Sequence, residues 1–419
     1  MTKKNILIAQ SGGPTAVINS SVVGAFYRSL ESNKIDRIYG AANGILGVLK
    51  EEIIDLTNQN RKIIDGMVYT PSSALGSCRY RLNTDIGHGD YKRIFEVLEA
   101  HNIGYFLYNG GNDSMDTASK LDYYAKKMGI DIKIMGIPKT VDNDLKGTDH
   151  SPGYGSAAKY LNIAAIESAF DCNTYTADTV VIMEVMGRHA GWLAASTALS
   201  VYEGKPVPDL IYLPEVPFDM ERFLSDVDRL HRKQHIVFAV VSEGIKDEKG
   251  QLIGAQEDNI DKFGHKQLGG VSLILQRIVE DNITRRVKVI NPSILQRCAM
   301  HCVSKTDLDE AYWMGYMATD YAINEYSGYM AGIKRISNKP YQWQPIMVPL
   351  GDVANAEQLF PTKWVIPEGN FVTNDAIEYM QPLIDGEVPI PTKKGLPQYT
   401  VIEKTFIDKK LPKWDGVVR

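Results

Sequence analysis

The sequence has few cysteines, no long apolar run and almost no excess of charge. Its 419 residues include four cysteines, too few and too scattered for a disulfide framework, so we expect a reducing, cytoplasmic location. No apolar run approaches the roughly 20 residues needed to cross a bilayer, which argues against a membrane partner. Lysine and arginine number 46 against 51 aspartates and glutamates, a net charge of -5, which argues against a general nucleic-acid binder.

Short apolar segments alternate with amphipathic stretches along most of the chain. This alternation is typical of mainly parallel sheets with helices on both faces, so the sequence predicts Rossmann-like three-layer α/β domains. The expected strands are Asn5–Gln10, Arg37–Ala42, Tyr105–Tyr108, Ile132–Ile137, Thr179–Val185, Leu210–Leu213, His235–Val241 and Val287–Ile290. The expected helices are Ala16–Leu30, Met115–Met128, Ser156–Phe170, Met220–Lys233, Val271–Thr284 and Leu308–Tyr326.

The length predicts two or three domains, because ordinary domains hold about 100–200 residues. We place the first α/β domain at residues 1–148 and the second at 149–306, with a helix near 307–330 that packs back on the first. From 331 to 419 the composition shifts towards proline and aromatic residues. We expect this part to be an irregular C-terminal extension packed on the body.

Three expected strands of the first domain end in loops with glycine, carboxylate or lysine side chains. The strands run into Gly12-Gly13, into residues 110–114 (Gly-Gly-Asn-Asp-Ser) and into residues 138–144 (Pro-Lys-Thr-Val-Asp-Asn-Asp). Because right-handed crossovers put the carboxyl ends of parallel strands at one edge, we expect these loops to meet there. Glycine-rich turns before helices hold phosphate oxygens, and carboxylates hold magnesium. The sequence therefore predicts a site for a phosphate and a metal ion.

Each of these loops alone has a plainer explanation. A glycine pair after a strand is often only a turn, and Asp113 and Ser114 are favoured residues for capping a helix. The pair Asp142 and Asp144 is harder to explain, because two close carboxylates repel unless a cation or several donors lie beside them. One of them can stay ionised on magnesium while the other takes a proton.

The second domain also carries polar side chains directly after its strands. Gly187 permits close approach of a ligand, and Arg188 beside it can form a bidentate contact with a phosphate. Glu243 follows another strand and can accept hydrogen bonds from a sugar. Arg297 stands by itself, and a single arginine is more often a surface residue than a ligand contact.

Taken in order, these motifs resemble those of the phosphofructokinase family over roughly residues 4–330. The elements that carry the resemblance are Ser11-Gly12-Gly13, Leu75-Gly76-Ser77-Cys78-Arg79, Gly110-Gly111-Asn112-Asp113-Ser114, Pro138-Lys139-Thr140-Val141-Asp142-Asn143-Asp144, Met186-Gly187-Arg188, Ser242-Glu243-Gly244 and Gln296-Arg297. Any one element is common, whereas the ordered set is highly specific. The resemblance implies the phosphofructokinase fold, in which the first domain binds the phosphoryl donor and the second binds the sugar phosphate.

The resemblance also implies a reaction, the transfer of a phosphoryl group to the 1-hydroxyl of fructose 6-phosphate, a step of glycolysis and gluconeogenesis, with Mg2+ as cofactor. It implies that Asp142 is the general base, with support from Thr140, Asp144 and Arg188. The implied sugar-phosphate contacts are Thr140, Val141, Asp142, Met186, Gly187, Arg188, Glu243 and, on the 6-phosphate, Arg297. The implied donor contacts are Gly12, Gly13, Arg79, Gly111, Asp113 and Lys139, and the implied metal ligands are Asn112 and Asp113.

The identity of the donor depends on two residues. Asp113 and Lys139 stand where ATP-using members of the family have glycines. Asp113 places bulk and negative charge where the α-phosphate of ATP would lie, and Lys139 can neutralise a leaving phosphate. Both residues are similar to those of the pyrophosphate-dependent branch, so we predict pyrophosphate as donor in a reversible reaction. Two alternatives stay open: ATP as donor, and a non-catalytic regulatory subunit of the same fold, since Asn112 stands where the family usually has aspartate.

Further departures from the family concern the 6-phosphate. Thr179 and Leu308 occupy positions where many ATP-dependent members carry basic residues, so the 6-phosphate must be bound differently, and Lys266 is a candidate. Members of the family are dimers or tetramers, so the resemblance implies a homo-oligomer.

Overall fold

The computed structural model describes residues 3–254 and 270–416. The chain forms two compact units. The first unit comprises Met1–Ser156, Arg297–Glu357 and Gly386–Arg419, and the second comprises Ala157–Gln296 and Gln358–Asp385. Within the part of the chain that is described, no helix is both long and apolar enough to span a membrane.

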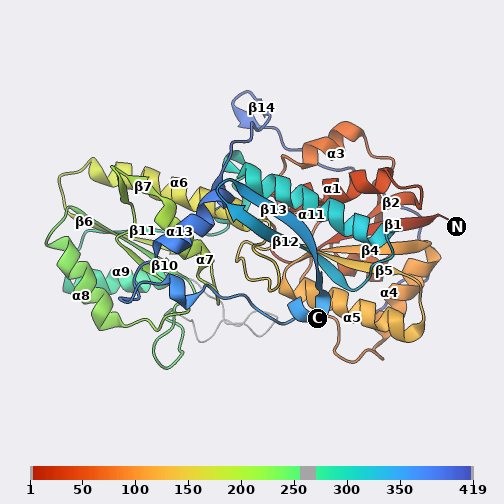
Figure 1. Ribbon diagram of the computed structural model, residues 1–419, viewed down its shortest axis with the longest axis horizontal. Coiled ribbons are helices and arrows are strands. Elements are labelled where there is room, and N and C mark those ends of the chain that lie inside the picture. The colour runs from red at the N-terminus through yellow and green to blue at the C-terminus, as the bar shows by residue number, and fades with distance from the viewer. Residues whose placement is uncertain (1–2, 255–269, 417–419) are drawn as a thin grey trace. The chain divides into compact units, whose positions relative to one another are not determined.

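A seven-stranded sheet forms the centre of the first unit (Figure 1). The order across the sheet is β13 (Tyr341–Pro349), β12 (Tyr329–Asn338), β5 (Lys133–Pro138), β4 (Ile103–Gly110), β1 (Lys4–Gln10), β2 (Ile35–Ala41) and β3 (Ile53–Asp55). The five inner strands are parallel, and the two edge strands are antiparallel to their neighbours.

Helices cover both faces of this sheet because its inner strands bury apolar side chains on both sides. On one face, Ile6 of β1 belongs to a core shared with α1 (Ile18–Leu30) and α11 (Lys305–Ile323), which lie side by side in Figure 1. On the other face, Leu7 belongs to a core shared with α4 (Gly89–Ala100) and α5 (Asn112–Met128). The shorter elements of this unit are α2 (Ile45–Lys50), α3 (Arg61–Met67), α12 (Leu350–Val353), a 3-10 turn at Met300–Cys302, and the hairpin of β14 (Thr392–Lys393) and β15 (Leu396–Pro397).

Helices α1 and α11 approach each other so closely that their contact requires glycine. A Cβ on Gly24 would lie 2.0 Å from the carbonyl oxygen of Tyr312, and a Cβ on Gly315 would lie 1.8 Å from that of Ser21. A larger side chain at either position would force the helices apart. This packing fixes α11 against the first sheet.

The second unit is built on a smaller, all-parallel sheet. Its strand order is β11 (Val287–Ile290), β6 (Thr179–Val185), β10 (Ile236–Ser242) and β9 (Leu210–Tyr212). The core on this sheet includes Phe223 of α8 (Met220–His231) and Leu275 of α9 (Val271–Asn282). The other elements of this part of the chain are α6 (Tyr154–Asn173), α7 (Trp192–Ser196), α10 (Leu295–Cys298), α13 (Asn374–Met380), the hairpin of β7 (Val201–Tyr202) and β8 (Lys205–Pro206), and 3-10 turns at Thr197–Leu199, Thr362–Trp364 and Gln381–Ile384.

The α/β fold class is confirmed, and all strands and helices expected from the sequence are present, with ends that differ by a few residues at most. The expectation of an irregular segment from residue 331 onwards is wrong. β12 and β13 form a hairpin that extends the first sheet beyond β5, and residues 331–419 are divided between the two units. In β13, half-buried and exposed residues alternate only from Tyr341 to Gln344, and the apolar residues 346–348 stand between two prolines, so the sequence does not indicate a strand there.

Candidate active site

Three loops of the first unit leave neighbouring parallel strands at the same edge of the sheet. β5, β4 and β1 are adjacent, and their carboxyl ends run into residues 139–144, 111–114 and 11–13. The expectation that these three loops meet is confirmed. Helix α5 begins at Asn112, directly after Gly111, so the positive end of its dipole lies at this edge.

Two cations approach the backbone of the Gly12–Gly13 turn. A Cβ on Gly12, whose φ is +75°, would lie 3.2 Å from Lys139 Nζ, and a Cβ on Gly13 would lie 3.1 Å from Arg297 Nη1. Lys139 Nζ donates a hydrogen bond of 2.6 Å to the carbonyl oxygen of Gly13. The Nε of Arg297 is buried and has no hydrogen-bond partner among the described residues. Two cations at one backbone turn favour an anionic ligand.

Lys139 is almost fully buried at the end of β5, with 2% of its surface exposed. Burial lowers the pKa of its ammonium group to about 8, although Asp142 and Asp144 oppose this shift, and the nearby charge of Arg297 lowers it further. A buried charge is costly unless an opposite charge lies beside it. A phosphate bound at the turn would provide that charge and stabilise the ammonium form.

The loop that carries Arg79 is tied to the same turn. The hydroxyl of Ser77 donates a hydrogen bond of 2.6 Å to the carbonyl oxygen of Gly12. The backbone N–H of Gly12 in turn lies 3.5 Å from the carbonyl oxygen of Cys78. Arg79 follows directly and is exposed, so it reaches solvent beside the glycine turn.

A buried pair of oxygens lies next to these cations. Asn112 Nδ2 donates a hydrogen bond of 2.9 Å to Asp144 Oδ2, while Asn112 Oδ1 and Asp144 Oδ1 are buried and accept no hydrogen bond within residues 3–254 and 270–416. Burial raises the pKa of Asp144. Mg2+ prefers oxygen ligands and usually takes one or two from the protein and the rest from water and phosphate. These two free oxygens fit such an ion.

Asp113 points elsewhere in this structure. Its side chain is 71% exposed, and Oδ1 accepts a hydrogen bond of 2.9 Å from Nη2 of Arg81, a residue that the sequence analysis missed. Asp144, rather than Asp113, is therefore the carboxylate that faces Asn112. The sequence signal for Arg81 is only its place two residues after Arg79.

Asp142 lies in the loop of residues 139–153, and hydrogen bonds within this loop hold its backbone. The N–H of Asp142 donates to Thr140 Oγ1 at 3.1 Å, and the N–H of Thr140 donates to the carbonyl oxygen of Pro152 at 3.2 Å. On the other side, the buried Asn143, with a φ of +54°, accepts a hydrogen bond of 2.8 Å from the N–H of Ser151. Val141 is buried, whereas Asp142 itself is partly exposed.

The second unit holds its own predicted residues at the ends of two adjacent strands. β6 and β10 are paired, and they run into Met186–Arg188 and into Glu243. The hydroxyl of Ser242 donates a hydrogen bond of 2.5 Å to the carbonyl oxygen of Gly187, whose φ of +139° suits glycine. This bond joins the two loops, and Arg188 and Glu243 are both partly exposed there.

Of the two residues expected at the 6-phosphate, the structure describes one. Arg297 belongs to the first unit and lies at the Gly12–Gly13 turn, so the structure places it with the predicted donor contacts. Lys266 lies outside the described residues.

The family model for phosphofructokinase matches residues 5–320. The chain belongs to the phosphofructokinase family. A protein of Xanthomonas campestris named pyrophosphate–fructose 6-phosphate 1-phosphotransferase is 41% identical over 420 residues, which cover 99% of this chain and 100% of the relative. The resemblance to the pyrophosphate-dependent branch is therefore confirmed.

Two solved structures agree with this assignment. Crystal structures of pyrophosphate-dependent phosphofructokinases from Nitrosospira multiformis and Marinobacter aquaeolei each match with a TM-score of 0.90, at 39% and 38% identity. The matches cover 98% and 99% of this chain and 99% and 100% of theirs.

We expect Asp144→Asn to weaken divalent-cation binding in the presence of pyrophosphate by at least about tenfold, because it removes the charged member of the buried pair. Asp113→Asn should change it by less than about twofold, because that carboxylate is exposed and paired with Arg81. Titration with Mn2+, followed by electron paramagnetic resonance, measures both. The reverse order of effects would make Asp113 the ligand.

Proposed function

We propose that this chain transfers a phosphoryl group reversibly from pyrophosphate to the 1-hydroxyl of fructose 6-phosphate, giving fructose 1,6-bisphosphate and phosphate. The observation that carries the proposal is that Lys139 and Arg297 both approach the Gly12–Gly13 turn. This turn lies at the same edge of the sheet as the loop that carries Asp142. The names of relatives that match over the whole chain support this activity.

Phosphoryl transfer depends on positioning and on neutralisation of charge. Asp142 accepts the proton of the 1-hydroxyl as that oxygen attacks the phosphoryl group. Lys139 and Arg79 neutralise charge that develops on the transferred group and on the leaving phosphate. The backbone amides at the start of α5 supply further donors at this edge.

We assign the magnesium site to Asn112 and Asp144. Bound there, Mg2+ would neutralise the oxygens of the donor and act as a Lewis acid on them. The free Oδ1 atoms of both residues support this assignment. Water and phosphate oxygens would supply its remaining ligands.

We assign the sugar phosphate to the loops of the second unit, through Met186, Gly187, Arg188 and Glu243. Arg188 suits a phosphate, and Glu243 suits sugar hydroxyls. From its place at Gly13 we propose that Arg297 contacts the phosphoryl group on the donor side, and its contact with the 6-phosphate stays a prediction. A cytoplasmic location and a homo-oligomer, either dimer or tetramer, remain predictions.

The donor assignment is tested by initial rates with fructose 6-phosphate and Mg2+, with pyrophosphate or ATP as donor. We expect turnover with pyrophosphate and a kcat/KM for ATP at least about 100-fold lower, because Asp113 and Lys139 disfavour the longer donor. The double variant Asp113→Gly/Lys139→Gly should narrow that ratio. Activity with ATP alone would refute the donor assignment, and no activity with either would favour the non-catalytic subunit.

Asp142→Asn should lower kcat by about 10²–10⁴-fold, because it removes the general base, and should leave the KM for fructose 6-phosphate nearly unchanged. Asp131→Asn, which removes an exposed carboxylate paired with Lys133, is the control. Steady-state kinetics of both variants check this. A variant at position 142 that keeps most of its turnover would show that another group takes the proton.

Lys139 is expected to set an alkaline limit on activity. The ammonium form predominates below its pKa of about 8, so kcat/KM for pyrophosphate should fall as the pH rises through that value. An arginine keeps its charge to much higher pH than a lysine. In Lys139→Arg the fall in kcat/KM near pH 8 should therefore disappear, even where the absolute rate is lower. An unchanged pH profile in the variant would contradict the role of Lys139.

A further inference from the structure

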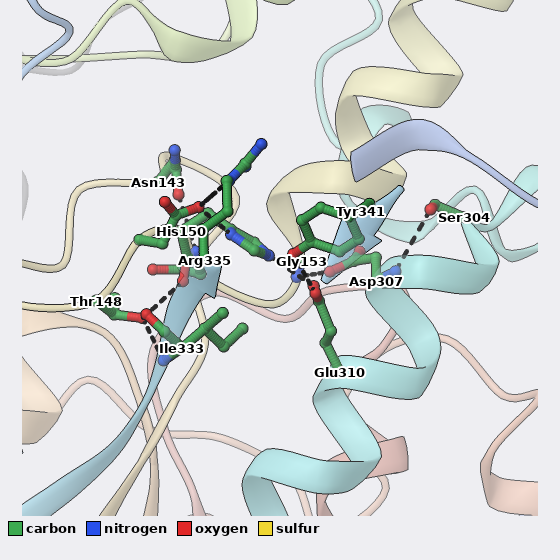
Figure 2. Close-up of polar contacts among 12 residues, drawn as sticks. Asn143, Thr148, His150, Gly153, Ser304, Asp307, Glu310, Ile333, Arg335 and Tyr341 are labelled. Atoms are coloured by element: carbon green, nitrogen blue, oxygen red, sulfur yellow. Dashed lines mark hydrogen bonds and ion pairs between the residues drawn. The ribbon is translucent and has the colours of Figure 1, made fainter. Parts of the chain in front are cut away.

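A buried histidine that the proposed chemistry does not use lies in the 139–153 loop (Figure 2). His150 is 2% exposed. Its Nδ1 lies 2.8 Å from Asp149 Oδ1, and its Nε2 lies 2.6 Å from Oε2 of Glu310 on α11. A ring that donates to two carboxylates must carry a proton on both nitrogens. The geometry therefore favours the charged form.

The two carboxylates have further partners on the hairpin β12–β13. Nε and Nη2 of Arg335 donate to Asp149 Oδ1 at 3.0 and 2.9 Å, and the hydroxyl of Tyr341 donates to Glu310 Oε1 at 2.5 Å. Burial alone would lower the pKa of His150, but the charge of Glu310 and the hydrogen bonds to both carboxylates raise it to about 9. The four charged groups balance one another in a buried setting.

The residues that follow His150 hold both sides of Asp142. The N–H of Ser151 donates to Asn143 Oδ1, and the carbonyl oxygen of Pro152 accepts from the N–H of Thr140. These two bonds hold Asn143, directly after Asp142, and Thr140, two residues before it. A shift of the backbone at position 150 would therefore be passed to Asp142.

The same loop has two further anchors in the first unit. The N–H of Asp149 donates to the carbonyl oxygen of Ile333 on β12 at 2.8 Å, and the N–H of Gly153 donates to Asp307 Oδ1 on α11 at 2.7 Å. Figure 2 shows the contact of Gly153 with Asp307. His150 therefore links the loop to α11 between two points where the backbone is already held.

We propose that His150 is a positioning residue for Asp142: its bridge from Asp149 to Glu310 sets the backbone of the loop so that Ser151 and Pro152 hold Asn143 and Thr140. The proposal rests on the proposed function, in which Asp142 takes the proton of the sugar hydroxyl. It assigns His150 no contact with either substrate.

His150→Asn tests this, with His235→Asn as the matched control. His235 also pairs with an aspartate, Asp178 at 2.8 Å, but it is partly exposed and belongs to the second unit. We expect His150→Asn to lower kcat about tenfold or more, while the KM for pyrophosphate changes less than about twofold, because misplaced groups slow chemistry more than binding. The control should keep both constants.

The pH dependence of stability gives a second reading. The charged ring binds its proton more tightly in the folded chain, so its stabilising effect is full below the unfolded pKa of 6.5 and disappears as the pH rises through about 9. The wild type should therefore unfold at a higher denaturant concentration than His150→Asn at low pH, and this difference should disappear as the pH rises from 6.5 to about 9. The other charged groups around position 150 are the same in both proteins: Asp149, Glu310, Arg335 and Asp307.

Hydrogen exchange of the 139–153 peptides gives a third reading. Exchange in His150→Asn should be faster there and unchanged in α1 and β6. A kcat within about twofold of wild type, or unchanged exchange in the loop, would overturn the proposal. A wild type without pyrophosphate-dependent turnover would instead refute the proposed function. If His150→Asn does not fold, the double variant His150→Asn/Glu310→Gln serves for all three comparisons, because position 310 then carries no charge and Asp149 keeps its ion pair with Arg335.

Discussion

The first unit is organised around a buried ammonium group at the end of a central strand. Lys139 is withdrawn from water at a site where Arg297 adds a second positive charge. Asp142 and Asp144 offset part of this charge, and the carbonyl oxygen of Gly13 accepts a hydrogen bond from the ammonium. The remaining positive charge is costly in a dry environment until an anion arrives. We infer that this edge of the sheet binds phosphate, and the proposed base Asp142 and the proposed metal ligand Asp144 lie on the loop that contains Lys139.

The rest of the first unit keeps these groups in place. The adjacent parallel strands β5, β4 and β1 bring three loops to one edge, and the two apolar cores hold the sheet between helices. The close packing of α1 against α11 fixes Asp307 and Glu310, which hold the 139–153 loop from outside. Each of these contacts limits the movement of the loop, and so of Asp142 and Asp144.

Much of this arrangement could be predicted from the sequence, because buried parallel strands are apolar runs and polar loops follow them directly. The edge strand β13 was not predicted because its apolar residues 346–348 stand between Pro345 and Pro349, and prolines are uncommon inside strands. The role of His150 was not predicted because its partner Glu310 lies 160 residues further along the chain, and no local pattern indicates such a pair. The direction of Asp113 towards Arg81, and the place of Arg297 at Gly13, depend on side-chain orientation and tertiary packing, which spacing in the sequence does not specify.

The most direct test of the central claim is a crystal structure of the protein with Mg2+ and methylene diphosphonate, a pyrophosphate analogue that cannot be cleaved. The account predicts that phosphonate oxygens contact Lys139 Nζ and the guanidinium of Arg297 at the Gly12–Gly13 turn, with the metal on the Oδ1 atoms of Asn112 and Asp144. An analogue bound away from this turn, with Lys139 still bonded only to protein, would contradict it.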